Sequence, residues 1–114
     1  MPEFYTVLGR VYAANRALAL HEMAASYREP GAGHDEERAR LFDAGADYIE
    51  GKPVAHELLP RVRRLVPDHL RCAAEELLRS EKPGPATDQA YADLRSTAAA
   101  IDRPGGDRPI PWPV

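Results

Sequence analysis

The sequence predicts an all-α protein, an up-and-down four-helix bundle with a broken third helix and an extended proline-rich C-terminal tail. Proline and glycine clusters divide the chain into four segments, each long enough to form a helix. No segment alternates β-branched and polar residues over the length of a strand. A chain of 114 residues is also too short for a second hydrophobic core. We therefore assign residues 1–103 to one helical bundle domain and residues 104–114 to the tail.

The first two segments are amphipathic. In residues 3–28, successive side chains placed about 100° apart give one apolar stripe that we expect to face the core: Phe4, Val7, Leu8, Val11, Ala14, Leu18 and Ala25. In residues 34–50 the expected core face is Leu41, Phe42, Gly45, Tyr48 and Ile49. The opposite, solvated face of that helix consists of Glu36, Arg40, Asp43, Asp47 and Glu50. Gly51 suits the C-terminus of this helix, and Pro53 suits the first turn of the next.

Prolines shape the rest of the chain. Pro60 and Pro67 each remove a backbone donor and clash with the preceding turn, so we expect the third segment to be kinked or broken there. A fresh helix after Pro67 would bury Leu70, Ala73, Ala74 and Leu77. The fourth helix is expected to begin at Thr87, an N-cap residue, and to present Tyr91, Leu94, Ala98 and Ile101.

Composition limits the classes of function. The 15 basic and 18 acidic residues nearly cancel, which gives no general attraction to nucleic acid or to acidic membranes. Leu, Val, Ile and Phe together number 22 residues against 19 alanines, so the core is thin and an oligomer or a docked partner is expected. Cys72 is the single cysteine, and no apolar run is long enough to span a membrane. We expect a cytoplasmic protein, and the Ala, Arg and Pro content is typical of GC-rich bacterial genes.

Polar residues interrupt the expected core stripe of the first helix. Asn15 and Glu22 lie near its middle, with His21 on one flank. A carboxylate inside a bundle costs several kcal/mol unless it is paired, protonated or bound to a metal. His56 and Glu57 could complete such a cluster, although the Glu-x-x-His pattern of di-iron bundles is absent. Alternatively, Glu22 reaches water from the helix end.

We therefore keep Asn15, His21 and Glu22 as candidate residues for binding a ligand or partner. The sequence predicts no resident metal and no other cofactor. The common phosphate-loop and His-Glu-x-x-His motifs are absent from it.

Arginine and histidine recur at a spacing that HEPN-type ribonucleases use, in which an arginine is followed four to six residues later by a histidine. Four pairs fit the spacing: Arg16 with His21, Arg28 with His34, and Arg63 and Arg64 with His69. In that family Asn, Asp or His usually follows the arginine, whereas here the residues that follow are Ala17, Glu29, Arg64 and Leu65, so we infer no membership. The chemistry itself remains open, because histidine can transfer protons and arginine can stabilise phosphate charge.

Two further features are candidate contact sites. A basic patch could bind phosphate, although the acidic segment 34–50 could equally neutralise it within the bundle; it consists of Arg61, Arg63, Arg64 and Arg71. In the tail, prolines flank Trp112, and we expect Ile110 and Trp112 to dock on a helical surface of their own bundle or of a partner.

The leading functional hypothesis is a non-enzymatic interaction or scaffold protein, a subunit of a homodimer or of a larger assembly. The alternative is a small hydrolase, a HEPN-like ribonuclease or a metal-binding bundle that uses the polar cluster on the first helix.

Overall fold

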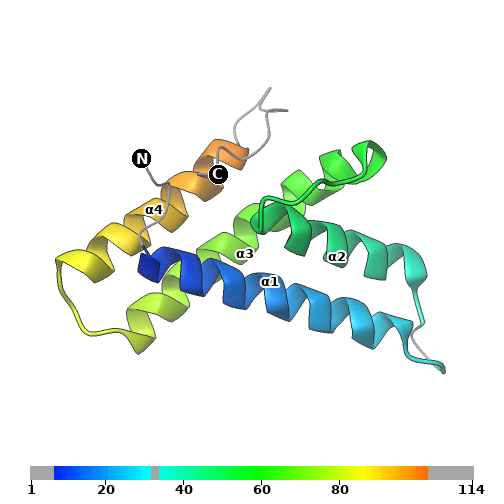
Figure 1. Ribbon diagram of the computed structural model, residues 1–114, viewed down its shortest axis with the longest axis horizontal. Helices are drawn as coiled ribbons and strands as arrows, with labels where there is room; N and C mark the ends of the chain where they lie inside the picture. Colours follow the sequence, from blue (N-terminus) through cyan, green and yellow to red (C-terminus); the bar gives the residue numbers. More distant parts are fainter. Residues whose placement is uncertain (1–6, 32–33, 103–114) are drawn as a thin grey trace.

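The computed structural model describes residues 7–31 and 34–102. These residues form four α-helices and one short 3-10 turn, with no strand among them, which confirms the predicted all-α class. Figure 1 shows two helical hairpins, α1–α2 and α3–α4, with α1 crossing α3. The elements are α1 (Val7–Arg28), α2 (Glu36–Ile49), η1 (His56–Leu58), α3 (Leu59–Ser80) and α4 (Pro85–Asp102).

Side-chain and backbone caps set both ends of α2. Before the helix, the carboxylate of Asp35 accepts a hydrogen bond of 3.0 Å from the backbone N–H of Arg38, which satisfies one of the donors that a helix start leaves free. After it, Gly51 adopts a φ of 79°, a conformation that favours glycine. The N–H groups of Gly51 and Lys52 bond back to the carbonyls of Tyr48 and Asp47, at 3.2 and 2.8 Å. This is a Schellman motif, and it confirms the predicted helix end.

The break that we expected in the third helix at Pro67 is absent from α3. The helix continues from Leu59 to Ser80 with Pro67 inside it, while Pro60 occupies the first turn, where its missing N–H is harmless. An internal proline costs about 3 kcal/mol. Fully burying one Val or Leu side chain contributes about 1.5–3 kcal/mol, and Val66 and Leu70 on either side of Pro67 are both completely buried. Packing of the apolar face therefore outweighs the lost backbone bond.

The start of α4 also differs from the expectation. The helix begins at Pro85, whose fixed φ suits a first helical position, rather than at Thr87. Thr87 lies inside the first turn, is buried, and donates its hydroxyl to the backbone carbonyl of Lys82 at 2.7 Å.

Small residues bring the four helices close together around a narrow core. Ten of the buried residues are alanines, and Gly45 on α2 lies so near α3 that an added Cβ would stand 3.0 Å from Cδ2 of Leu65. The predicted core positions of α3 and α4 are confirmed, because Leu70, Ala73, Ala74, Leu77, Leu94, Ala98 and Ile101 are all buried, and Tyr91 is partly buried against the same core. On α2, Gly45, Tyr48 and Ile49 are buried, and Leu41 and Phe42 pack against them as expected.

Most of the predicted core stripe of α1 is wrong: among its described members only Leu8, which is partly buried, packs against the core, and Phe4 lies outside the described residues. Val7, Val11 and Leu18 are 76%, 49% and 58% exposed, and Ala14 and Ala25 are exposed as well. The face that packs on the bundle is the opposite one: Gly9, Tyr12, Ala13, Ala17, Leu20 and Ala24. α1 carries apolar residues around most of its circumference, so periodicity alone did not select the buried side. The chain buries the face whose small residues let α2 and α3 approach.

Among the helices that the structure describes, none is both long and apolar enough to cross a membrane.

Candidate functional site

His21 of α1 meets three carboxylates of α2 at the junction of the two helices. Its Nδ1 lies 2.8 Å from Oδ1 of Asp43. Its Nε2 lies 3.4 Å from Oε1 of Glu50 and 3.9 Å from Oδ1 of Asp47. All four side chains are about one-third exposed, so solvent reaches the cluster. We call these four residues the His21 cluster.

The local sequence explains why the three acids converge. Asp43, Asp47 and Glu50 follow one another at spacings of four and three residues, which places them on one face of a helix. Glu50 is the C-cap residue of α2, and the Schellman motif holds its backbone in place. The antiparallel α1–α2 hairpin then brings His21 against this acidic face.

Hydrogen bonds and charges within the His21 cluster shift the pKa values of His21 and Asp43. The hydrogen bond to Asp43 raises the pKa of His21, against the lowering effect of its burial, and the charges of the three acids act in the same direction as that bond. Burial would raise the pKa of Asp43, but hydrogen bonds from His21 and Arg28 outweigh it and lower that pKa. Arg28 bonds the second carboxylate oxygen of Asp43 and also pairs with Glu36. Lys52 pairs with Oε2 of Glu50 at 3.2 Å.

The cluster differs from the one expected from the sequence. His21 is part of it, but Glu22 is exposed, with no hydrogen bond or ion pair to any described residue. Of the other expected members, His56 is exposed on η1 and Glu57 faces Arg40 of α2 at 3.8 Å. Asp43, Asp47 and Glu50 were assigned to a solvated face. Their spacing of four and three residues, which places all three acids on one face of the helix, was the signal that could have revealed them.

The outward face of α1 is the second candidate surface. Val7, Val11, Ala14, Leu18 and Ala25 form it, and we call it the α1 stripe. Its first and last members are separated by 18 residue steps, which is about 27 Å along a helix. Asn15 and Glu22 are exposed along its border, so two of the predicted binding residues lie beside this stripe.

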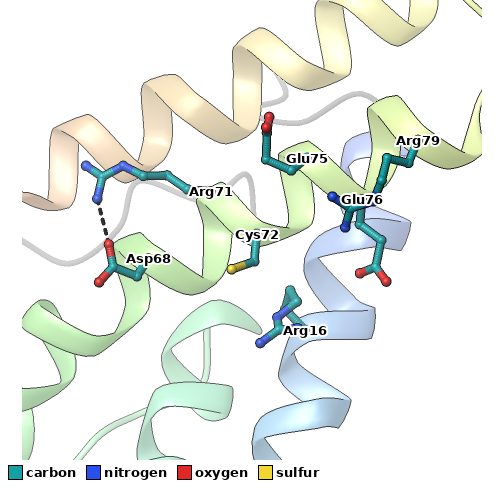
Figure 2. A pocket seen from close by; sticks show the side chains of 7 residues that line it. All are labelled: Arg16, Asp68, Arg71, Cys72, Glu75, Glu76 and Arg79. Atoms are coloured by element: carbon teal, nitrogen blue, oxygen red, sulfur yellow. Dashed lines mark hydrogen bonds and ion pairs between the residues drawn. The ribbon is translucent and has the colours of Figure 1, made fainter.

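A shallow groove of about 520 Å³ lies between α1 and α3 (Figure 2). Arg16 reaches into it from α1, and the other lining residues come from α3: Asp68, Arg71, Cys72, Glu75, Glu76 and Arg79. Three arginines thus face three acids, and Arg71 is already paired with Asp68 and with Asp102. The formal charges of the lining cancel, so the groove favours neither an anion nor a cation.

Arg16 and His21, a pair that fits the ribonuclease spacing, have other partners in the structure. Arg16 contacts His69 of α3 at 2.6 Å, while His21 contacts Asp43. Arg28 is held by Glu36 and Asp43. The arrangement joins an arginine and a histidine that lie 53 residues apart, a pairing that sequence spacing cannot reveal.

The basic patch is largely engaged within the chain. Arg61 pairs with Glu37 of α2 at 2.9 Å, as the internal alternative anticipated. Arg63 donates to the carbonyl of Ile101 at 2.8 Å, Arg71 binds two acids, and Arg64 is exposed. The expected docking of Ile110 and Trp112 lies outside the described residues.

Comparisons of the chain with protein-family models, with curated proteins and with solved structures give no match. Functional inference therefore rests on the geometry of these surfaces.

Proposed function

We propose that this protein is a self-associating helical interaction domain, in which the α1 stripe binds the same stripe of a second copy. The supporting observation is the exposure of Val7, Val11 and Leu18 along one line of a helix whose opposite face already packs in the core. Aligned exposed apolar side chains of this kind mark interaction sites. The small core of the monomer supports the same conclusion, because a dimer would add buried apolar area.

The spacing of the stripe suits a helical partner. Residues 7, 11, 14 and 18 follow the alternation of four and three residues by which paired helices interlock their side chains, and Ala25 follows seven residues later, with His21 at the position between. Large and small members also complement each other when two copies run antiparallel. Leu18 then meets Ala14 of the second copy, and Val7 meets Ala25 of the second copy.

The antiparallel arrangement also separates like charges. A parallel pair would place His21 against His21 of the second copy, whereas the antiparallel pair puts them at opposite ends. Asn15 and Glu22 would form part of a polar rim around the apolar centre, which is the usual anatomy of an interface.

Light scattering across micromolar concentrations tests the proposal. The full chain should give twice the monomer mass of 12.6 kDa. Leu18→Glu should yield monomers that keep their helical circular dichroism, because the side chain is 58% exposed in one copy. Because both copies carry the substitution, the dimer interface loses two leucines. Burial of each contributes about 1.5–3 kcal/mol, so dimerisation should weaken about a hundredfold or more.

Leu78→Glu is the matched control, since Leu78 is 44% exposed on α3 and is not a member of the α1 stripe. It should leave the dimer unchanged. A wild-type mass of 12.6 kDa throughout, or equal dissociation by both variants, would reject the proposal.

A further inference from the structure

We propose that His21, Asp47 and Glu50 bind one divalent transition-metal cation, of which Zn²⁺ and Mn²⁺ are representative, with Asp43 orienting the imidazole. The three ligand atoms lie within 4.8 Å of one another, and they come from two helices that pack side by side. His21 borders the α1 stripe between Leu18 and Ala25, but all the ligands come from one chain, so the site does not depend on self-association.

The orientation of the His21 imidazole leaves its Nε2 atom available to bind a cation. An ionised Asp43 can only accept a hydrogen bond, so Nδ1 of His21 must donate the one observed at 2.8 Å. In the neutral ring, Nε2 then presents its lone pair toward the oxygens of Glu50 and Asp47, at 3.4 and 3.9 Å. Three electron-rich atoms converge here, and Lys52, the described cation that pairs with Glu50, contacts its other oxygen, Oε2. A cation at their centre, either a proton on Nε2 or a metal ion, relieves this repulsion.

Asp43 has the position of the outer carboxylate that accompanies most metal-bound histidines. It fixes the tautomer and the plane of the ring, and Arg28 holds its second oxygen. Asp43 is therefore a positioning residue, and His21, Asp47 and Glu50 are the ligands.

A tetrahedral ion would require the three ligand atoms, now within 4.8 Å of one another, to draw closer together. Nitrogen and oxygen ligands bound at about 2.0–2.2 Å to such an ion lie about 3.4 Å apart. The Nε2 to Oε1 separation of 3.4 Å already has that value, and the Asp47 oxygen needs to approach Nε2 by about half an ångström. Solvent access to the cluster leaves the fourth position to water.

Charge at the end of α2 favours the same cation. Asp47 and Glu50 lie at its C-terminus, where the helix dipole is negative, and the last turn contains no basic residue. Arg28 and Lys52 pair with two of the three carboxylates. Arg28 is shared with Glu36, so the four carboxylates, Glu36 included, exceed the two cations by two charges, which a divalent cation bound to the neutral imidazole compensates. The imidazole selects against Mg²⁺ and Ca²⁺, which prefer oxygen ligands.

Calorimetric titration of the chelator-treated full chain with ZnCl₂ should show one site per chain. His21→Ala should abolish this binding, and Asp43→Asn should weaken it about ten- to a hundredfold. His56→Ala is the matched control, because His56 is exposed on η1 and outside the cluster, and it should bind Zn²⁺ like the wild type. Equal Zn²⁺ affinity in the His21→Ala and His56→Ala chains would overturn the assignment, as would no binding by the wild type.

A measurement on the unaltered chain guards against variants that fail to fold. Substoichiometric Mn²⁺ broadens the proton resonances of nearby imidazoles, so the signals of His21 should disappear before those of the other three histidines. Uniform broadening of all four, or none at all, would overturn the proposal.

Discussion

The guanidinium of Arg16 on α1 donates to the unprotonated Nδ1 of His69 on α3, at a distance of 2.6 Å. Arginine has no acceptor, so this geometry requires His69 to accept. Burial, followed by the positive charge of Arg16, lowers the pKa of His69, and the adjacent Asp68 opposes the shift only in part. The contact joins the two hairpins through a neutral histidine.

The first prediction concerns acid stability. Because the pKa of folded His69 is lowered, the unfolded chain binds more protons as the pH falls below about 6.5, the ordinary value for histidine. The contribution of His69 is fully present above that pH and is lost as the pH falls toward the folded pKa. His69→Asn keeps an acceptor near Arg16 but does not titrate, so it should flatten this part of the stability curve.

Urea unfolding at a series of pH values measures the effect, with His56→Asn as the exposed control. The raised pKa of His21 acts in the opposite direction, but it is common to both variants and cancels in the comparison. A His69→Asn curve parallel to that of the control would contradict the prediction.

The second prediction concerns the buried face of α1. Leu20 is completely buried, so Leu20→Ala should lower the free energy of unfolding by about 2–5 kcal/mol. Leu18, two residues away, projects outward, and Leu18→Ala should cost less than about 1 kcal/mol in the dilute monomer. Denaturant titrations of the two variants compare the faces directly. The reverse order would mean that the helix is rotated.

The third prediction concerns the Schellman motif that ends α2. Gly51 has a φ of 79°, which costs a residue with a Cβ about 1–2 kcal/mol. Gly51→Ala should lower the stability by about that amount. Gly84 has no atom within 4 Å of an added Cβ and no positive φ, so Gly84→Ala should be neutral or slightly stabilising. Thermal unfolding that ranked the two variants equally would refute the role given to Gly51.

The fourth prediction compares two buried threonines on α4. The hydroxyl of Thr87 donates to the loop carbonyl of Lys82, whereas that of Thr97 donates to the carbonyl of Asp93 one turn earlier in the same helix. Thr87→Val should cost about 0.5–1.5 kcal/mol, since it removes a bond between helix and loop. Thr97→Val should change little, because bonds of its kind add little to a helix. Chemical denaturation of the two variants distinguishes the contacts.

The sequence predicted the helices better than it predicted their orientation. Gly51 and the polar and apolar alternation of α2 have local causes, so local patterns identified them. The face of α1 depends on which side allows α2 and α3 to approach, and nothing within the segment records that choice. Pro67 was misjudged for the same reason, because the packing that keeps α3 continuous comes from other helices.

The candidate site was also predicted only in part, because some of its residues are recognised locally and others only through the packing of the helices. His21 was selected because it flanks Asn15 and Glu22, the polar residues that interrupt the expected apolar stripe. Asp43, Asp47 and Glu50 looked like ordinary surface residues, because acids on a helix exterior are usually solvated. Only the antiparallel pairing of α1 with α2 gives these three acids a histidine to face.

The pairing of the helices bears on how quickly the chain folds. The most extensive contacts join α1 to α2 and α3 to α4, which are neighbours along the chain. Each hairpin closes a short loop, so its formation costs little chain entropy and depends little on the other hairpin. The chain should collapse as two early hairpins whose docking is the slower step. Amide protons at the interface between the hairpins should then exchange through partial opening, well before those within either hairpin.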